Sequence, residues 1–100
     1  MKLRLELTQR AKRDLTKIKR YVAQRNSQAA ESIRKHIRAS LVRLTKFPQS
    51  GRPTDDSHTR ILTVARYPYV VFYGVRNGVI VIHHIRDARR EPIDPGVARS

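Results

Sequence analysis

The fold is decided by residues 60–85, which read RILTVARYPYVVFYGVRNGVIVIHHI. Valine, isoleucine and tyrosine dominate this stretch, and these residue types suit a pleated, half-buried surface. Pro68 and the pair Asn77-Gly78 divide it into three apolar runs. Asn-Gly between two apolar runs is typical of a type I′ hairpin turn, because both central residues need a positive φ. The stretch therefore predicts a three-stranded antiparallel meander.

The N-terminal half predicts a strand followed by a helical hairpin. Residues 2–7 alternate between polar and apolar side chains, which predicts an edge strand with one buried face. Thr8 is a suitable N-cap for a first helix over residues 9–24, and Ser27 for a second over residues 28–46. Each helix has an apolar stripe at helical spacing, namely Ala11, Leu15, Ile18 and Val22 in the first and Ala30, Ile33, Ile37, Leu41 and Leu44 in the second.

Together these elements predict an α+β fold of order β-α-α-β-β-β, with the helical hairpin packed on one face of an antiparallel sheet. Residues 1–92 are expected to form a single domain, and residues 93–100 a loosely ordered C-terminal tail. Residues 48–58 have the composition of a loop. Since the helices cover only one face of the sheet, we expect the other face to line a groove or to meet a partner.

Charge is the strongest feature of the composition. The chain has 22 Lys and Arg residues against 8 Asp and Glu, a net charge of +14. Residues 1–46 hold 14 basic and 3 acidic side chains, whereas residues 47–100 hold 8 and 5. Such a field attracts polyanions, so we expect nucleic acid, a ribosome or an acidic protein as a partner. A well-solvated basic surface without a specific partner has the same composition.

Several classes of protein are disfavoured by what the sequence lacks. There is no cysteine, which excludes disulfides and thiolate metal sites and suits a cytoplasmic protein. No run of about 18 apolar residues indicates a membrane span, and no apolar signal-peptide core follows Met1. No histidine and carboxylate set has the spacing of metal ligands, so we expect neither a metal nor a cofactor.

The order of elements and several short motifs resemble the ParE/RelE superfamily of toxins from type II toxin–antitoxin systems. The resemblance covers residues 3–92. Its motifs are Ala11, Asp14-Leu15 and Ile18 in the first helix, Leu44, Phe47-Pro48 and Gly51-Arg52 after the second, Arg60 with Leu62, Tyr67-Pro68-Tyr69-Val70-Val71 with Tyr73, and the closing segment Ile82 to Arg90. ParE-like members of this superfamily poison DNA gyrase, whereas RelE-like members cleave messenger RNA in the ribosome.

The resemblance favours a ParE-like toxin that inhibits DNA gyrase by binding and that a cognate acidic antitoxin neutralises. It implies target contacts at Arg60, Arg86, Arg89 and Arg90. For the antitoxin we expect a groove formed by the helical hairpin, the exposed apolar residues of the sheet and its basic rim, with contacts from Ile18, Tyr21, Val22, Tyr69, Val71 and Tyr73. Either an added strand or a helix laid in that groove would serve as the binding mode.

The alternative is a RelE-like, ribosome-dependent mRNA endonuclease. Its charge-stabilising and titratable set would be Arg60, His83, His84 and Arg86, because cleavage through the 2′-hydroxyl needs an acid, a base and positive charge. The two histidines are adjacent in a strand, so we expect them on opposite faces, one of them packed against the helices. No tyrosine or lysine follows Tyr73, and the C-terminal catalytic aromatic of the nuclease branch therefore has no counterpart.

Overall fold

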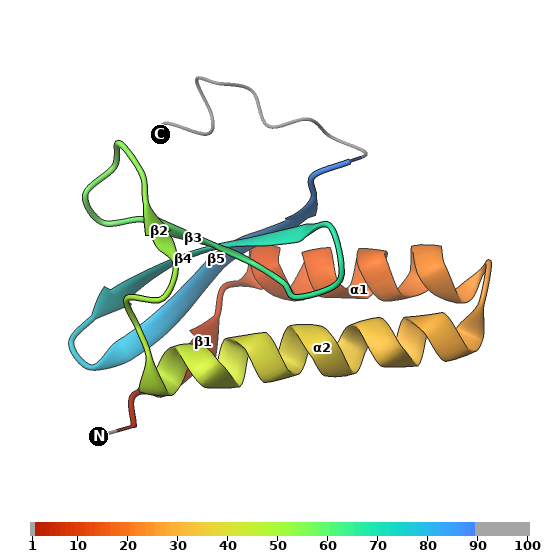
Figure 1. Cartoon of the computed structure of the whole chain (residues 1–100), viewed down its shortest axis with the longest axis horizontal. Helices are drawn as coiled ribbons and strands as arrows, with labels where there is room; N and C mark the ends of the chain where they lie inside the picture. Colours follow the sequence, from red (N-terminus) through yellow and green to blue (C-terminus); the bar gives the residue numbers. More distant parts are fainter. Residues whose placement is uncertain (1, 90–100) are drawn as a thin grey trace.

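The computed structural model describes residues 2–89 as a helical hairpin packed on one face of a five-stranded sheet (Figure 1). The elements are β1 (Arg4–Leu7), α1 (Gln9–Ala23), α2 (Ser27–Lys46), β2 (Arg52–Pro53), β3 (Arg60–Thr63), β4 (Tyr69–Arg76) and β5 (Val79–Asp87). Arg90 and the expected tail over residues 93–100 lie outside the described residues. Within residues 2–89, no helix is long and apolar enough to cross a membrane.

The predicted α+β fold is confirmed, but the sheet is mixed. Its strand order is β1-β5-β4-β3-β2, and β2 to β5 pair in antiparallel fashion. β1 instead joins the edge of β5 in parallel, with Leu5 opposite Ile80. Parallel partners need a long crossover, and the helical hairpin with the first strands of the meander provides it. The segment expected to be a loop contains the two-residue strand β2.

Turn and cap residues explain where the elements begin and end. Asn77 and Gly78 have φ values of 52° and 76°, which confirms the predicted turn between β4 and β5. Thr8 caps α1 as predicted, since its Oγ1 accepts a hydrogen bond from the Ala11 amide at 3.1 Å. The cap of α2 is Asn26 and not Ser27, because the Asn26 Oδ1 accepts from the amides of residues 28 and 29.

The main core lies between the helices and the sheet. It contains Ala11 from α1, the apolar stripe of α2, and alternate residues of the central strands, namely Tyr69, Val71 and Tyr73 of β4 with Ile80, Ile82 and Ile85 of β5. The opposite face of the sheet has a smaller apolar cluster formed by Ile61, Val70 and Phe72, with Ala88 packed against it. Residues 69–74 of β4 are therefore buried on both faces.

Candidate functional site

A β-bulge in β5 places both adjacent histidines on the face of the sheet away from the helices. Phe72 pairs with His84 and Tyr73 with Ile82, so His83 has no partner opposite it in β4. Ile82 and Ile85 both point into the main core, and the two histidines between them do not. The expectation that His83 and His84 lie on opposite faces is wrong, because the extra residue interrupts the alternation of the strand.

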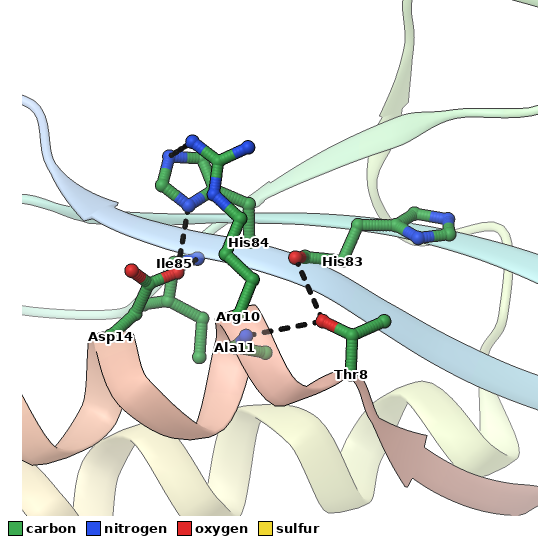
Figure 2. A network of polar contacts seen from close by, with 7 residues as sticks. All are labelled: Thr8, Arg10, Ala11, Asp14, His83, His84 and Ile85. Carbon is green, nitrogen blue, oxygen red and sulfur yellow. Dashed lines mark hydrogen bonds and ion pairs between the residues drawn. The ribbon is translucent and has the colours of Figure 1, made fainter.

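His84 joins β5 to α1 (Figure 2). Its Nδ1 lies 2.7 Å from Oδ2 of Asp14, and its Nε2 lies 3.4 Å from a guanidinium nitrogen of Arg10. Because arginine can only donate, this arrangement fits the tautomer with its proton on Nδ1, donated to the Asp14 carboxylate. The ring also stacks on Phe72, with 5.6 Å between centroids. His84 is thus a partly buried, hydrogen-bonded residue held from three sides.

Asp14 completes the hydrogen bonding at the edge of β5 beyond the end of β1. Its Oδ2 accepts from the backbone amide of Ile85 at 3.0 Å as well as from His84. One step earlier along the edge, the Thr8 hydroxyl donates to the His83 carbonyl at 3.0 Å (Figure 2). Side chains from the start of α1 therefore replace a neighbouring strand, which fixes the helix against the sheet.

Arg60 has a structural task in the loop after α2. Its Nη1 donates to the carbonyl oxygen of Gly51 at 2.6 Å and lies 3.4 Å from that of Gln49. The same loop is held by Tyr73, whose hydroxyl accepts from the Gly51 amide at 2.9 Å and donates to the Pro48 carbonyl at 2.8 Å. Burial raises the pKa of Tyr73, and the Gly51 amide and the charge of Arg60 oppose this in part.

The residues of the predicted nuclease set do not converge. Arg60 is directly opposite Tyr73, so it lies on the side of the sheet that faces the main core. Arg86 is opposite Val70, which places it with the two histidines on the other face. Within residues 2–89, no group of three or more His, Cys, Asp or Glu side chains is placed to hold a metal ion.

The predicted target contacts are divided in the same way. Arg86 and Arg89 lie at the end of β5 and just after it, whereas Arg60 is at the start of β3. The Arg89 side chain is exposed and lies 3.8 Å from the carboxylate of Asp87. Arg90 falls outside the described residues. The guanidinium of Arg89 is thus exposed beside Asp87, while that of Arg60 contacts the loop.

Half of the predicted antitoxin contacts are buried. The exposed fractions of Tyr69, Val71 and Tyr73 are 3%, 0% and 0%, because these side chains fill the main core beneath the helices. They offer no surface to a partner, and the expectation for these three residues is corrected. Ile18 and Val22 are partly buried against the same core, and Tyr21 lies under the guanidinium of Arg25 at 4.0 Å.

A groove with a basic rim lies between the two helices, but the residues that line it are not the predicted antitoxin contacts. It has a volume of about 500 Å³ and runs over the edge of β1. Its floor is apolar and its rim is basic, formed by Lys12 and Lys19 of α1 with Arg34 and Arg38 of α2. The accessible floor consists of the partly buried Leu5, Leu7 and Leu15, with the core residues Ile37 and Leu41 beneath it. The sequence signal was present, since these leucines and isoleucine belong to the predicted apolar faces.

The comparisons with known proteins agree on a family of toxins. The family model described as ParE toxin of the type II toxin–antitoxin system parDE matches residues 5–92. Toxin RelE2 of Caulobacter vibrioides is 32% identical over 83 residues, which cover 83% of this chain and 92% of that protein. The putative toxin Y4kP of Sinorhizobium fredii is 32% identical over 79 residues, with coverage of 79% and 82%.

A solved structure described as the chromosomal ParDE TA system from P. aeruginosa has the same fold. It matches with a TM-score of 0.76 at 24% sequence identity, and the match covers 85% of this chain and 95% of that chain. At this level of identity, the structural match supports the arrangement of the helical hairpin on the sheet.

Proposed function

The chain belongs to the ParE toxin family of type II toxin–antitoxin systems, and on this premise we propose that it inhibits DNA gyrase by binding to it. A toxin of this class has an antitoxin as its partner. In this proposal the toxin acts in the cytoplasm and stabilises the complex of gyrase with cleaved DNA through contacts, without making or breaking bonds itself. Arg86 and Arg89 at the end of β5 are its proposed target contacts.

One observation carries the choice of a binding toxin over a nuclease. Arg60 lies on the core side of the sheet with its guanidinium on the loop carbonyls, while His83, His84 and Arg86 lie on the other face. Acid–base catalysis needs the acid, the base and the stabilising charge around one phosphate. The separation of Arg60 from the histidines supports a function in which these residues do not act together.

The decisive experiment adds the toxin, freed from its antitoxin, to purified gyrase with supercoiled plasmid and ATP. We expect linear DNA to accumulate after protease treatment, while a translation extract run in parallel is unaffected. Intact plasmid together with ribosome-dependent loss of message would instead establish the RelE-like endonuclease. Arg89→Ala should reduce the trapped DNA severalfold, since single interface contacts have graded effects. Arg20→Ala, an exposed arginine of α1, is the matched control.

We further propose that the groove between the helices binds the antitoxin. An apolar floor with four cations on its rim fits an amphipathic segment that carries Asp or Glu beside its apolar side chains. Complementary charge increases the rate of association and selects the partner. Ile18, Tyr21 and Val22 do not line this groove, and the buried tyrosines and Val71 of β4 do not take part.

A pair of charge reversals on α2 tests the position of the antitoxin. Arg38 lines the groove and Lys35 is exposed on the same helix without lining it. We expect Arg38→Glu to slow association with the antitoxin by about tenfold at low salt, and Lys35→Glu to have a much smaller effect. Equal effects of the two substitutions would show that only the overall charge matters and would remove the groove from the proposal.

A further inference from the structure

A second groove lies beside the hairpin of β4 and β5, and it is separate from the one between the helices. Its volume is about 480 Å³. Its polar lining comes from three segments, the loop before β3, the end of β4 with its turn, and the bulge of β5. These polar residues are His58, Arg76, Asn77 and His83, with Gly74 and two valines between them.

At Gly74 in β4 there is no room for a side chain. A Cβ built there would lie 2.5 Å from the carbonyl oxygen of His58 and 3.3 Å from Nε2 of His83. The loop therefore packs directly on the backbone of β4, and the His83 ring lies beside the same point. The bulge is what brings the His83 ring to this face. Glycine at such a position is typical where a ligand or another chain segment approaches the backbone closely.

Arg76 is the permanently charged residue in the lining of this groove. No carboxylate is among the residues that line it. Asp56 of the neighbouring loop uses its carboxylate locally, accepting from the His58 amide at 2.8 Å and from the Thr59 hydroxyl at 2.9 Å. The His58 amide and then the Thr59 hydroxyl lower the pKa of Asp56, and the charges of His58 and His83 contribute. Both imidazoles are thus electrostatically close to this loop.

We propose that the groove formed by His58, Gly74, Arg76, Asn77 and His83 binds a phosphodiester of a nucleic-acid strand. The guanidinium of Arg76 supplies a permanent charge and planar donors that match phosphate oxygens. Imidazole N–H groups and the Asn77 amide add neutral or charged donors. An imidazole ring also offers a face on which a base can stack.

This inference does not depend on gyrase being the target. Gly74 and His83 lie on the face of the sheet away from the helices, and the proposed antitoxin groove lies between the helices. A nucleic-acid strand in the groove beside the β4–β5 hairpin and an antitoxin in the groove between the helices would not compete for the same residues. The test therefore uses the full-length chain alone and does not measure toxicity or DNA cleavage.

The test follows the imidazole resonances by NMR while uridylyl-uridine, or its deoxy counterpart, is added to the full-length chain. The chain has 4 histidines, so each ring can be assigned, and His36 on α2 is an internal reference. We expect the His58 and His83 signals to shift together and to saturate in the millimolar range, while His36 stays close to its starting position. Shifts of equal size at His36, or none at His83, would overturn the proposal.

Two substitutions of exposed residues make the test specific. His83→Ala and Arg76→Gln should each raise the Kd about fivefold to tenfold, because each removes a donor to a charged oxygen. Arg20→Gln on α1 removes the same charge elsewhere and should change the Kd less than twofold. An equal loss with Arg20→Gln would show non-specific attraction and refute the site. Equal binding of both dinucleotides identifies the phosphodiester itself as the ligand, and preference for uridylyl-uridine identifies RNA.

Discussion

Tyr73→Phe removes one oxygen atom from the point where the loop after α2 is attached to the sheet. The Tyr73 side chain is fully buried, and its hydroxyl accepts from the Gly51 amide and donates to the Pro48 carbonyl. Phenylalanine fills the same volume except for that atom. The substitution therefore leaves the apolar packing intact and deprives two backbone groups of their partner.

The size of the effect follows from the burial of those groups. Leaving a buried backbone donor or acceptor unsatisfied costs about 1–3 kcal/mol. Gly51 is buried, whereas Pro48 is partly exposed and its carbonyl can reach water. We expect the free energy of unfolding to fall by about 2–4 kcal/mol in total. For a domain of this size that lowers the Tm by about 10–25 °C.

Chemical denaturation and thermal unfolding measure this loss, and Tyr67→Phe is the matched control. The Tyr67 hydroxyl is 2.9 Å from Oγ of Ser32 in a partly buried pair. Because the Ser32 hydroxyl can turn toward solvent, the control should lose only about 1 kcal/mol. If Tyr73→Phe were no more destabilising than Tyr67→Phe, the attachment of the loop through this hydroxyl would not be the stabilising contact that the geometry suggests.

The same pair of variants predicts a pH dependence. Burial raises the pKa of Tyr73 in the folded state above the value of about 10 for an exposed tyrosine. Between these two values the unfolded chain has released its proton and the folded chain has not, so stability falls as pH rises. The stability advantage of the natural protein over Tyr73→Phe should therefore be constant below about pH 9 and shrink above pH 10. An advantage that grows with pH would contradict the direction of this pKa change.

Two further substitutions test contacts made by the helix and the turn. Asp14→Ala should lower the free energy of unfolding by about 2–3 kcal/mol, because the Ile85 amide and the His84 ring lose their shared acceptor. Urea denaturation measures this loss, and the stability of Asp14→Asn should lie between those of the natural protein and Asp14→Ala. Gly78→Ala should cost about 1–2 kcal/mol from its positive φ alone, since a Cβ there meets nothing within 4 Å. A much larger loss of stability would mean that the added methyl group clashes with a neighbouring residue, contrary to the open space around Gly78.

The order and type of the elements could be predicted because local signals agreed with each other. The Asn77-Gly78 turn, the Thr8 cap and the helical stripes each specify a local geometry that tertiary packing did not override. The partner of β1 could not be predicted. Alternation in residues 2–7 specifies which side chains are buried, but it leaves open which strand is the neighbour and in which direction it runs. That choice depends on where the helical hairpin returns the chain.

The prediction of antitoxin contacts on β4 was wrong for a related reason. Alternation correctly grouped Tyr69, Val71 and Tyr73 on one face of β4. Both faces of that strand are apolar, however, and the sequence does not say which face the helices cover. The lining of the groove between the helices was not predicted, because Leu15, Ile37 and Leu41 belong to apolar stripes that otherwise serve the core. Which of these side chains stay accessible depends on how α1 packs against α2.

The bulge did leave a trace in the sequence, and a deletion can test what it does. The inward residues Ile80, Ile82 and Ile85 are spaced by two and then by three, and the step of three requires one extra residue in the strand. Deleting His83 restores a spacing of two and keeps Phe72 opposite His84. We therefore expect a folded domain, destabilised by about 1 kcal/mol through loss of the bond from Thr8.

The deletion should preserve the contact between His84 and Asp14 and weaken the binding of uridylyl-uridine at least as much as His83→Ala does. The regular strand that results still points Ile82 and Ile85 into the core, so nothing in the packing of the helices requires the extra residue. An unfolded protein would show that the bulge serves the fold. A folded protein that bound the dinucleotide with unchanged affinity would show that His83 takes no part in binding. A folded protein with clearly weakened binding would mean that the bulge positions a side chain for a ligand, and β-bulges are often found beside such sites.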